Sequence, residues 1–278
     1  MGEPAYTPFA GQVALIATMH GKQAALGPPL ARLGFEVRTA EGLDTDAFGA
    51  FSGETERART MLDAARAKAR AAFAVSRDAD WVFASEGAFG PHPALPVLPG
   101  YRELICALRP SDGLEVVETA TGFETNFAHI DADSATDLDT FLGRIGFPDH
   151  AVIIKAGARV LAKAVTARTE LDALIARHGA VRIETDMRAH LNPTRMAEIA
   201  KLADRLAGRL AATCPACSAP GWGRTGAEPG LRCEACGSPT ALIAEEIWSC
   251  SACDHTERRE RSDGLAAADP GDCPVCNP

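Results

Sequence analysis

The chain has 278 residues, of which 46% are hydrophobic and 23% charged, and a net charge of −9. These values suit a globular protein with one large and one small domain, and no apolar run approaches the ~20 residues of a membrane span. The start, Met1 to Pro4, lacks a signal-peptide pattern, and Tyr6 stands where a myristoylation site has Ser or Thr. We therefore expect a cytoplasmic protein without a membrane partner, with its cysteines reduced.

Strands and helices alternate along residues 1–211. Short apolar runs predict strands covered on both faces: 13–17, 81–84, 104–108, 116–117, 151–154 and 181–183. Composition and capping residues predict helices from Glu56 to Val75, from a Ser134 cap to Ile145, from a Thr169 cap to Gly179, and from Asn192-Pro193 to about Thr213. The pattern predicts an α/β domain with a mixed sheet and flanking helices, ending at residue 211.

The turn Ala17-Thr18-Met19-His20-Gly21-Lys22 follows the first predicted strand. Backbone N–H groups and an ammonium group converge on phosphate in such turns. The glycine spacing is not that of a P-loop. A solvated loop explains the segment about as well as a phosphate site does.

Acidic residues between Leu43 and Gly90 form a second candidate region. Asp44, Asp46, Glu54 and Asp63 precede Ser85-Glu86-Gly87, which ends a predicted strand. Carboxylates at such positions can hold Mg²⁺. The alternative for Glu86 is a turn with a capping carboxylate.

The segment from Thr185 to Arg195 joins a predicted strand to a helix N-terminus. Arg188, His190 and Arg195 suit an anionic ligand at that position. Equally, Asp186 could pair with Arg188 or Arg195 and only orient the loop.

Eight of the nine cysteines form four C-x-x-C pairs after residue 211. They are Cys214/Cys217, Cys233/Cys236, Cys250/Cys253 and Cys273/Cys276. Two such pairs complete a tetrahedral zinc site, and disulfides, an iron site or a redox pair explain the spacing less well. The sequence therefore predicts a zinc-ribbon module at residues 212–278 with two structural zinc ions. Cys106 lies in an apolar run and is expected in the core.

Gaps of 15, 13 and 19 residues separate successive pairs. The first and third gaps fit zinc ribbons, so we pair the cysteines in order, as two tandem ribbons; an interleaved arrangement is the alternative. Gly237, Asp254 and Asn277, each following a pair, tolerate the positive φ of a metal-binding turn, whereas Ser218 suits it less. His255 could replace a cysteine ligand, but a surface role is favoured.

The tail from Thr213 onward carries five basic and ten acidic residues, a net charge of −5. Binding to nucleic acid needs the opposite sign. We therefore expect a protein partner, rather than nucleic acid, for the zinc module.

Four segments resemble an uncharacterised bacterial family known only as a domain of unknown function. They are the Ala17, Thr18, His20 and Lys22 start, the run from Ala84 to Pro93, the run from Thr185 to Met196, and the cysteine tail ending C-x-x-C-N-P. The resemblance covers essentially the whole chain and implies no activity.

The first ninety residues also resemble the inosine triphosphate pyrophosphatase family. The family's A-T-x-N-x-G-K turn is matched by Ala17-Thr18 and Gly21-Lys22, with His20 for Asn, and its T-F-E-E-N-A-x-x-K-A helix by five residues: Thr60, Asp63, Ala65, Lys68 and Ala69. Its D-D-S-G strand end becomes Ser85-Glu86-Gly87. The resemblance implies that the matched acids bind metal and that the matched lysine contacts phosphate. The family's later Ser-His-Arg segment has no clear counterpart.

The leading hypothesis is a Mg²⁺-dependent hydrolase of a nucleotide or other phosphorylated small molecule. Glu86 and Asp63 would be catalytic metal ligands, helped by Glu54, and the ligand would be held by five residues: Lys22, His20, Arg188, His190 and Arg195. The alternative is a non-catalytic ligand- or protein-binding protein that docks a partner through the zinc ribbons.

Overall fold

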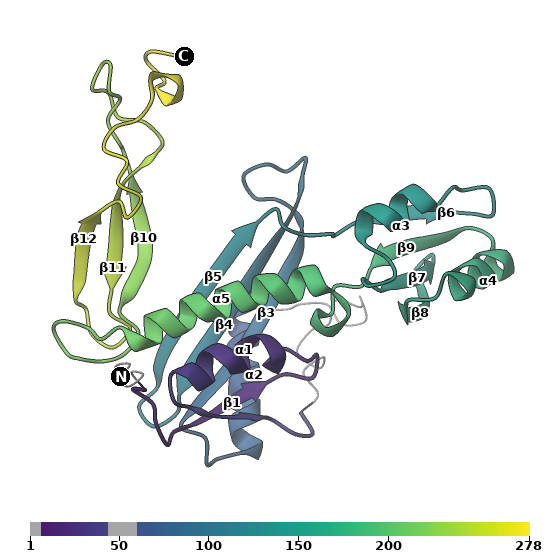
Figure 1. Cartoon of the computed structure of the whole chain (residues 1–278), viewed down its shortest axis with the longest axis horizontal. Helices are drawn as coiled ribbons and strands as arrows, with labels where there is room; N and C mark the ends of the chain where they lie inside the picture. Colours follow the sequence, from purple (N-terminus) through teal and green to yellow (C-terminus); the bar gives the residue numbers. More distant parts are fainter. Residues whose placement is uncertain (1–6, 44–59) are drawn as a thin grey trace, which may run out of the picture. The chain divides into compact units, whose positions relative to one another are not determined.

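A computed structural model describes residues 7–43 and 60–278. The chain forms two compact units, residues 1–113 with 117–207 and residues 114–116 with 208–278. The division falls within the last long helix, close to the expected boundary at residue 211. Figure 1 traces the elements of both units.

The main sheet of the first unit has five strands in the order β2-β1-β3-β4-β5. They are β2 (Glu36–Thr39), β1 (Val13–Ala17), β3 (Trp81–Pro91), β4 (Pro99–Arg109) and β5 (Leu114–Gly122). β2, β1 and β3 run parallel, whereas β4 pairs antiparallel with β3. The predicted α/β class and mixed sheet are confirmed.

Helices cover both faces of this sheet. α2 (Met61–Val75) packs on one face, where its fully buried Ala65, Ala69 and Ala72 allow close approach to the strands. On the other face lie α1 (Gln23–Arg32) and α5 (Pro193–Ala211), which are joined by an ion pair between Arg32 and Asp204 (Figure 1). The apolar stripe of α5 predicted from its sequence is buried, with Ile199 and Leu206 among its core residues.

A second, four-stranded antiparallel sheet has the order β6-β9-β7-β8. Its strands are β6 (His129–Ala132), β9 (Val181–Thr185), β7 (Val152–Ala156) and β8 (Arg159–Val165). α3 (Asp139–Ile145) and α4 (Arg168–His178) pack against it around Phe141, Leu171 and Ile183. A short 3-10 helix, η2 (Ala189–Leu191), then leads into α5.

Several helix boundaries differ from the sequence prediction. α3 begins at Asp139, because Ser134 lies in a turn closed by Asp133 and Thr136. α4 already begins at Arg168, so Thr169 is inside the helix rather than its cap. α1 was not predicted; it contains Pro28 and Pro29, which lack the N–H that an interior helical position normally donates. The expected start of α2 at Glu56 lies outside the described residues.

The tail unit is built on a three-stranded antiparallel sheet, β10 (Gly223–Pro229), β11 (Ile243–Ser249) and β12 (Thr256–Glu260). A 3-10 turn, η3 (Pro270–Asp272), precedes the last cysteine pair. Trp222 is buried against His255, with ring centroids 5.2 Å apart, and Arg259 lies 4.3 Å from the centroid of Trp248. These few large side chains form only a small apolar core.

None of the helices in the described parts of the chain combines the length and apolarity needed to cross a bilayer.

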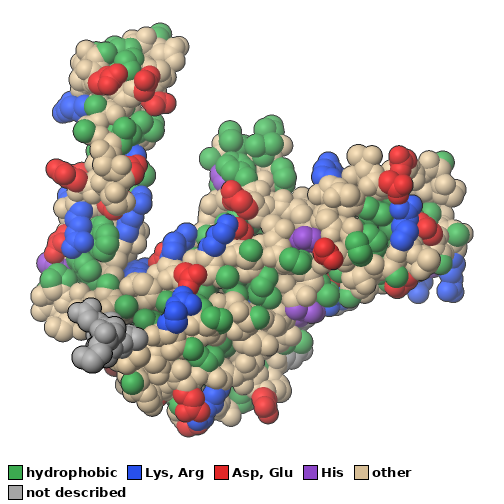
Figure 2. Space-filling view, in the orientation of Figure 1, with side chains coloured by type: hydrophobic (Ala, Val, Ile, Leu, Met, Phe, Trp, Pro, Cys, Tyr) green, Lys and Arg blue, Asp and Glu red, His purple; other side chains and the backbone are tan. Residues whose placement is uncertain are grey.

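Exposed apolar side chains gather at the tip of the β3–β4 hairpin. Leu95, Val97 and Leu98 are exposed there, and Phe123 lies against His92 with ring centroids 3.9 Å apart. Figure 2 shows the cluster as a projecting apolar patch.

A buried ion pair fastens α2 to the sheet. Lys68 Nζ lies 2.5 Å from Glu86 Oε1, and both side chains are less than a tenth exposed. Removing one partner of a buried pair leaves an unbalanced charge away from water, which usually costs more than the pair contributes.

We therefore expect Glu86→Gln to lower the free energy of unfolding by about 3 kcal/mol. Adding Lys68→Met should restore most of that loss, because no buried charge then remains unpaired. Urea denaturation of both single variants and the double variant measures this coupling. Arg32→Gln, which breaks an exposed pair, is the control and should cost under ~1 kcal/mol. Additive effects of Glu86→Gln and Lys68→Met would contradict the assignment.

Candidate functional site

The order in which strands are added to the main sheet reverses at β1. β2 lies on one side of β1 and β3 on the other, so the carboxyl end of β1 is a topological switch point. In open α/β sheets such a point is the usual place for a ligand crevice. The turn with His20, Gly21 and Lys22 follows β1 here and leads into α1. β1 ends at Ala17, opposite Ala84, so Ser85 is the first residue of β3 beyond it.

Lys22 is buried at this point and contacts a serine rather than a carboxylate. Its Nζ lies 2.9 Å from Ser85 Oγ and donates to the Ser85 carbonyl oxygen at 3.3 Å. Within residues 7–43 and 60–278, no carboxylate forms an ion pair with Lys22. Burial, reinforced by the neighbouring Arg195 guanidinium, lowers the pKa of Lys22 to about 7.

Arg195 and Glu103 form a second buried ion pair, on the face of the sheet that also carries Lys22. Arg195 Nε donates to Glu103 Oε1 at 2.6 Å, and the guanidinium also donates to the Met187 carbonyl. It lies 5.0 Å from the ring centroid of Phe89. Glu103 Oε2, although buried, has no hydrogen-bond partner among the described residues. A ligand hydroxyl or N–H group could donate to this oxygen.

Gly87 makes room for this pair. A Cβ at this position would lie 2.4 Å from Glu103 Oε1 and 2.6 Å from Arg195 Nη2. Any side chain here would force Glu103 or Arg195 to move, so the glycine next to Glu86 lets the two buried charges keep this arrangement.

The other predicted ligand-binding residues are His20, His190 and Arg188. His20 and His190 stack with centroids 5.3 Å apart and nearly parallel rings, which brings the β1–α1 turn against η2. Arg188 instead pairs with the fully buried Asp186 at 2.6 Å, and this carboxylate also accepts the Arg188 backbone N–H. Arg188 therefore matches the alternative in which Asp186 orients the loop.

Glu86 and Asp63 lie apart from Lys22. Side chains alternate between the faces of a strand, so Glu86 points to the α2 face while Ser85 and Lys22 meet on the other. Asp63 lies in the first turn of α2, where its backbone N–H donates to the hydroxyl of the cap residue Thr60 and its carboxylate accepts from that hydroxyl at 2.7 Å. Glu54, Asp44 and Asp46 lie outside the described residues.

A Mg²⁺ site needs several oxygen ligands around one point and usually keeps water molecules. Glu86 is only 2% exposed and is paired with Lys68. Within the described chain, groups of three or more potential ligands occur only as two cysteine quartets. The described carboxylates thus do not fit Mg²⁺.

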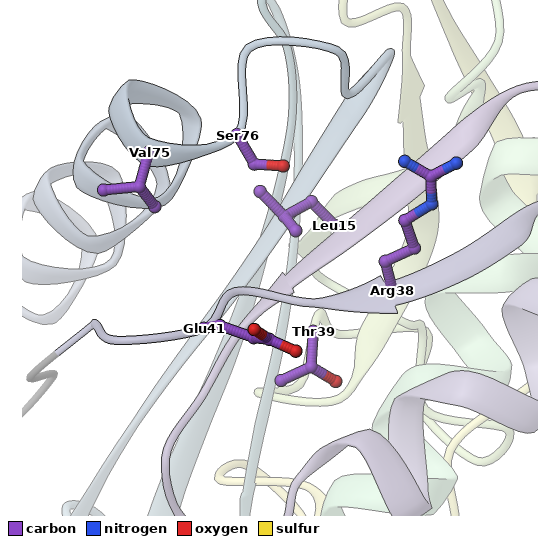
Figure 3. A pocket seen from close by; sticks show the side chains of 6 residues that line it. All are labelled: Leu15, Arg38, Thr39, Glu41, Val75 and Ser76. Carbon is purple, nitrogen blue, oxygen red and sulfur yellow. The ribbon is translucent and has the colours of Figure 1, made fainter.

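None of the described pockets is lined by Lys22, Ser85, Glu103 or Arg195, although two are lined by Phe89, which lies next to Arg195. Figure 3 shows one of about 460 Å³ that is lined by Leu15, Arg38, Thr39, Glu41, Val75 and Ser76. Its Arg38 is already held by Glu36 and Asp78 at the surface, so its charge is balanced within the protein.

The eight tail cysteines form two clusters. One holds Cys214, Cys217, Cys250 and Cys253, and the other Cys233, Cys236, Cys273 and Cys276. Sulfur–sulfur distances between pairs are 3.6 Å and 3.9 Å in each cluster. Tetrahedral zinc with Zn–S bonds of ~2.3 Å requires sulfurs ~3.8 Å apart, whereas a disulfide requires ~2.05 Å. Each cluster therefore has the geometry of a four-thiolate metal site.

The in-order pairing predicted from the gaps is wrong, and the interleaved alternative is correct. One strand lies between each cysteine pair and the next, and successive strands run antiparallel. The first and third pairs therefore meet at one end of the sheet, and the second and fourth at the other (Figure 1). The gap lengths allowed either pairing.

Turn conformations at the clusters also differ from expectation. Gly237 has a φ of 72°, as predicted, but Ser218, with φ 61°, is the other left-handed residue, whereas Asp254 and Asn277 are not left-handed. Backbone N–H groups of Ala216 and Ala252 point at cysteine sulfurs, at 3.4 Å and 3.2 Å. His255 is not a member of either cluster and contacts Glu257.

Sequence reasoning missed Glu103 and did not connect Lys68 with Glu86. One sequence signal could have indicated Glu103: it directly precedes the apolar run 104–108. Burying an unpaired carboxylate there would cost free energy, so a partner of opposite charge was to be expected. No local pattern indicated that Arg195, distant in the chain, is its partner.

The pairing of the cysteines can be tested by removing whole quartets. Replacing Cys214, Cys217, Cys250 and Cys253 with Ser removes one cluster, so about one metal ion per chain should remain. Replacing Cys214, Cys217, Cys233 and Cys236 instead damages both clusters, and nearly all metal should be lost. Elemental analysis of each variant against wild type gives the count. In-order pairing would reverse the two results.

Lys22 should make stability depend on pH. Because its pKa falls from 10.5 to about 7 on folding, the unfolded chain binds more protons between these values. The free energy of unfolding therefore rises with pH across that interval. Lys22→Met should stabilise the protein by on the order of 2 kcal/mol near pH 7, with the gain shrinking as pH approaches 10.5.

Thermal unfolding of wild type and Lys22→Met across this pH range measures the difference. Lys201→Met, at an exposed lysine of α5, is the matched control and should give no such gain at neutral pH. A Lys22→Met effect that does not change with pH would show that Lys22 is charged throughout.

Comparison with known proteins identifies the family but no activity. Neither curated proteins nor solved structures gave a match, and the resemblance to inosine triphosphate pyrophosphatases is not shown. A family model described as a domain of unknown function (DUF6671) matches residues 70–278, including β3, Arg195 and all eight clustered cysteines. The chain therefore belongs to this domain-of-unknown-function family.

Proposed function

We propose that the first unit binds and hydrolyses a nucleotide or another phosphorylated small molecule at the carboxyl end of β1. The observation that carries the proposal is Lys22, a buried lysine at a topological switch point with no described carboxylate as its partner. Other buried charges of this region have a partner of opposite sign, as in Lys68–Glu86 and Arg195–Glu103.

The charge balance favours an anionic ligand. On the α1 and α5 face, Arg195 is paired with Glu103, whereas Lys22 forms no ion pair with a carboxylate of the described residues, so its ammonium form is not balanced by one of them. A phosphate oxygen that accepts a hydrogen bond from Lys22 would offset this charge. The same ligand would lie at the N-terminus of α1, where backbone N–H groups attract anions.

The stacked His20 and His190 supply further donors next to the turn. Imidazole N–H groups can donate to phosphate oxygens or ligand hydroxyls. Gly21 permits this approach, since a Cβ there would lie 3.2 Å from His190 Cβ. Lys22, the two histidines and Arg195 would thus contribute to one ligand site, which is formed by the segments 20–22, 85–87 and 188–195.

A second candidate is binding without catalysis. It is supported by the engaged state of Glu86 and Arg188, which pair with Lys68 and Asp186 and so are not poised to hold a metal or a phosphate. In this case the ligand site and the tail would act as recognition surfaces. The reaction proposed for the first candidate includes no metal step, because the described residues do not form a Mg²⁺ site.

We further propose that both cysteine clusters hold zinc and serve to fold the tail. The unit has a small apolar core, so metal binding would supply stability that packing does not. Thiolate ligands need a reducing compartment, which favours the cytoplasm. The net charge of −5 in the tail favours a protein partner over nucleic acid.

The ligand proposal predicts that inorganic phosphate and phosphorylated compounds bind wild-type protein. Lys22→Met should weaken binding about 10- to 100-fold, because a charge-assisted contact is lost. Titration calorimetry with phosphate, nucleoside phosphates and sugar phosphates measures the affinity, and Lys201→Met is the matched control. Equal affinities for wild type and Lys22→Met would refute the site.

Turnover separates the two candidate functions. Product release from the compounds that bind should be followed with Mg²⁺, with Mn²⁺ and with a chelator that spares tightly bound zinc. Release of phosphate or pyrophosphate by wild type supports the hydrolase. Tight binding with no release in any of these conditions supports the binding protein.

A further inference from the structure

Ser85 occupies a distinctive position in the first unit. It is the first residue of β3 beyond the end of β1, and its Oγ is held 2.9 Å from Lys22 Nζ. Both residues are nearly buried but not fully enclosed, since Ser85 is 4% and Lys22 7% exposed. A serine at hydrogen-bond distance from a base is the arrangement needed to activate a hydroxyl nucleophile.

Lys22 can act as such a base only when it is unprotonated. Its surroundings disfavour the ammonium form, because the side chain is desolvated and Arg195 lies nearby. The two described carboxylates of the region are paired with other cations, Glu86 with Lys68 and Glu103 with Arg195. The pKa of about 7 leaves much of Lys22 neutral in the neutral pH range, as general-base catalysis requires.

The geometry around the pair is fixed by residues that do not react. Gly87 leaves the space that Arg195 and Glu103 occupy two residues beyond Ser85. Arg195 is also held by the Met187 carbonyl. Its charge is thus kept at a fixed place beside the pair, where it can lower the pKa of Lys22 and attract an anionic substrate.

We propose that Ser85 is a catalytic nucleophile and Lys22 its general base, so that hydrolysis passes through a phosphoserine. This inference rests on the proposed function. It differs from metal-activated water attack, because the first bond to phosphorus is made by the protein.

The reaction balances in two steps. First, Ser85 Oγ attacks phosphorus while its proton moves to Lys22 Nζ; the bond to the leaving oxygen breaks, and that oxygen takes its electron pair and the proton from Lys22. Second, water attacks phosphorus and gives a proton to Lys22; the Oγ–P bond breaks, and Ser85 Oγ recovers the proton. In each step the transient ammonium of Lys22 lies next to the transferred phosphoryl group, whose charge it offsets.

A fluorophosphonate reagent tests the nucleophile without knowledge of the natural substrate. Wild-type protein should gain one adduct, which peptide mass spectrometry places on Ser85, and Ser85→Ala should gain none there. Lys22→Met should react about 100-fold more slowly, whereas Ser111→Ala, at an exposed loop serine, should react like wild type. The wild-type labelling rate should rise with pH through the neutral range and then level off.

Substrate turnover provides the second readout. With any phosphorylated compound that wild type hydrolyses, acid quenching should trap a phosphoryl group on Ser85, and Ser85→Ala should abolish turnover while phosphate binding stays within about threefold. Ser85→Thr, which keeps a hydroxyl, should recover part of the activity.

The two proposals fail differently. Absence of a Ser85 adduct in wild type, or full turnover by Ser85→Ala, would overturn the nucleophile even if phosphate binds. If wild-type protein does not bind phosphate or phosphorylated compounds, the proposed ligand site is wrong. If Ser85 is labelled but the protein does not bind phosphate, the proposal of an activated serine stands, and the proposal of a phosphorylated substrate is wrong.

Discussion

The need to balance buried charge shapes the first unit. Five ionisable side chains of the described residues are buried around the carboxyl end of β1 and the adjoining part of β3: Lys22, Lys68, Glu86, Glu103 and Arg195. Burying an ion is costly unless an opposite charge offsets it. Two pairs satisfy this requirement and connect α2 and α5 to opposite faces of the sheet. Lys22 does not satisfy it in this way, and its lowered pKa is the consequence. Structure and candidate chemistry therefore have the same physical origin.

The same region shows how a β-strand separates two roles in adjacent residues. Ser85 and Glu86 point to opposite faces because side chains alternate along a strand. Glu86 completes the packing of α2, whereas Ser85 contacts Lys22 in the crevice. A stretch of sequence that reads as one motif thus contains a structural carboxylate and a hydroxyl at the candidate site. Gly87 continues the pattern, since its missing side chain admits Arg195 and Glu103.

The tail follows a different constraint. Its sheet has three short strands and a small apolar core, so its fold depends on what the cysteines bind. Each cluster joins cysteine pairs separated by two strands, Cys214/Cys217 with Cys250/Cys253 and Cys233/Cys236 with Cys273/Cys276. Metal at both ends would therefore tie all three strands together. In-order ribbons would instead have joined only neighbouring segments and left the two halves independent.

Sequence alone determined the mixed α/β class, the strands with continuous apolar runs, the apolar stripe of α5 and the eight cysteines spaced as metal ligands. These features are local, because periodicity, capping and C-x-x-C spacing act over a few residues. It also brought attention to Lys22, His20, His190 and Arg195, although not to the contacts they make. Only the tertiary structure decided that the cysteine pairs interleave, that Glu86 pairs with Lys68, and that Arg195 pairs with Glu103. Each of these depends on strand direction or on contacts between segments far apart in the chain, and no local pattern encodes either.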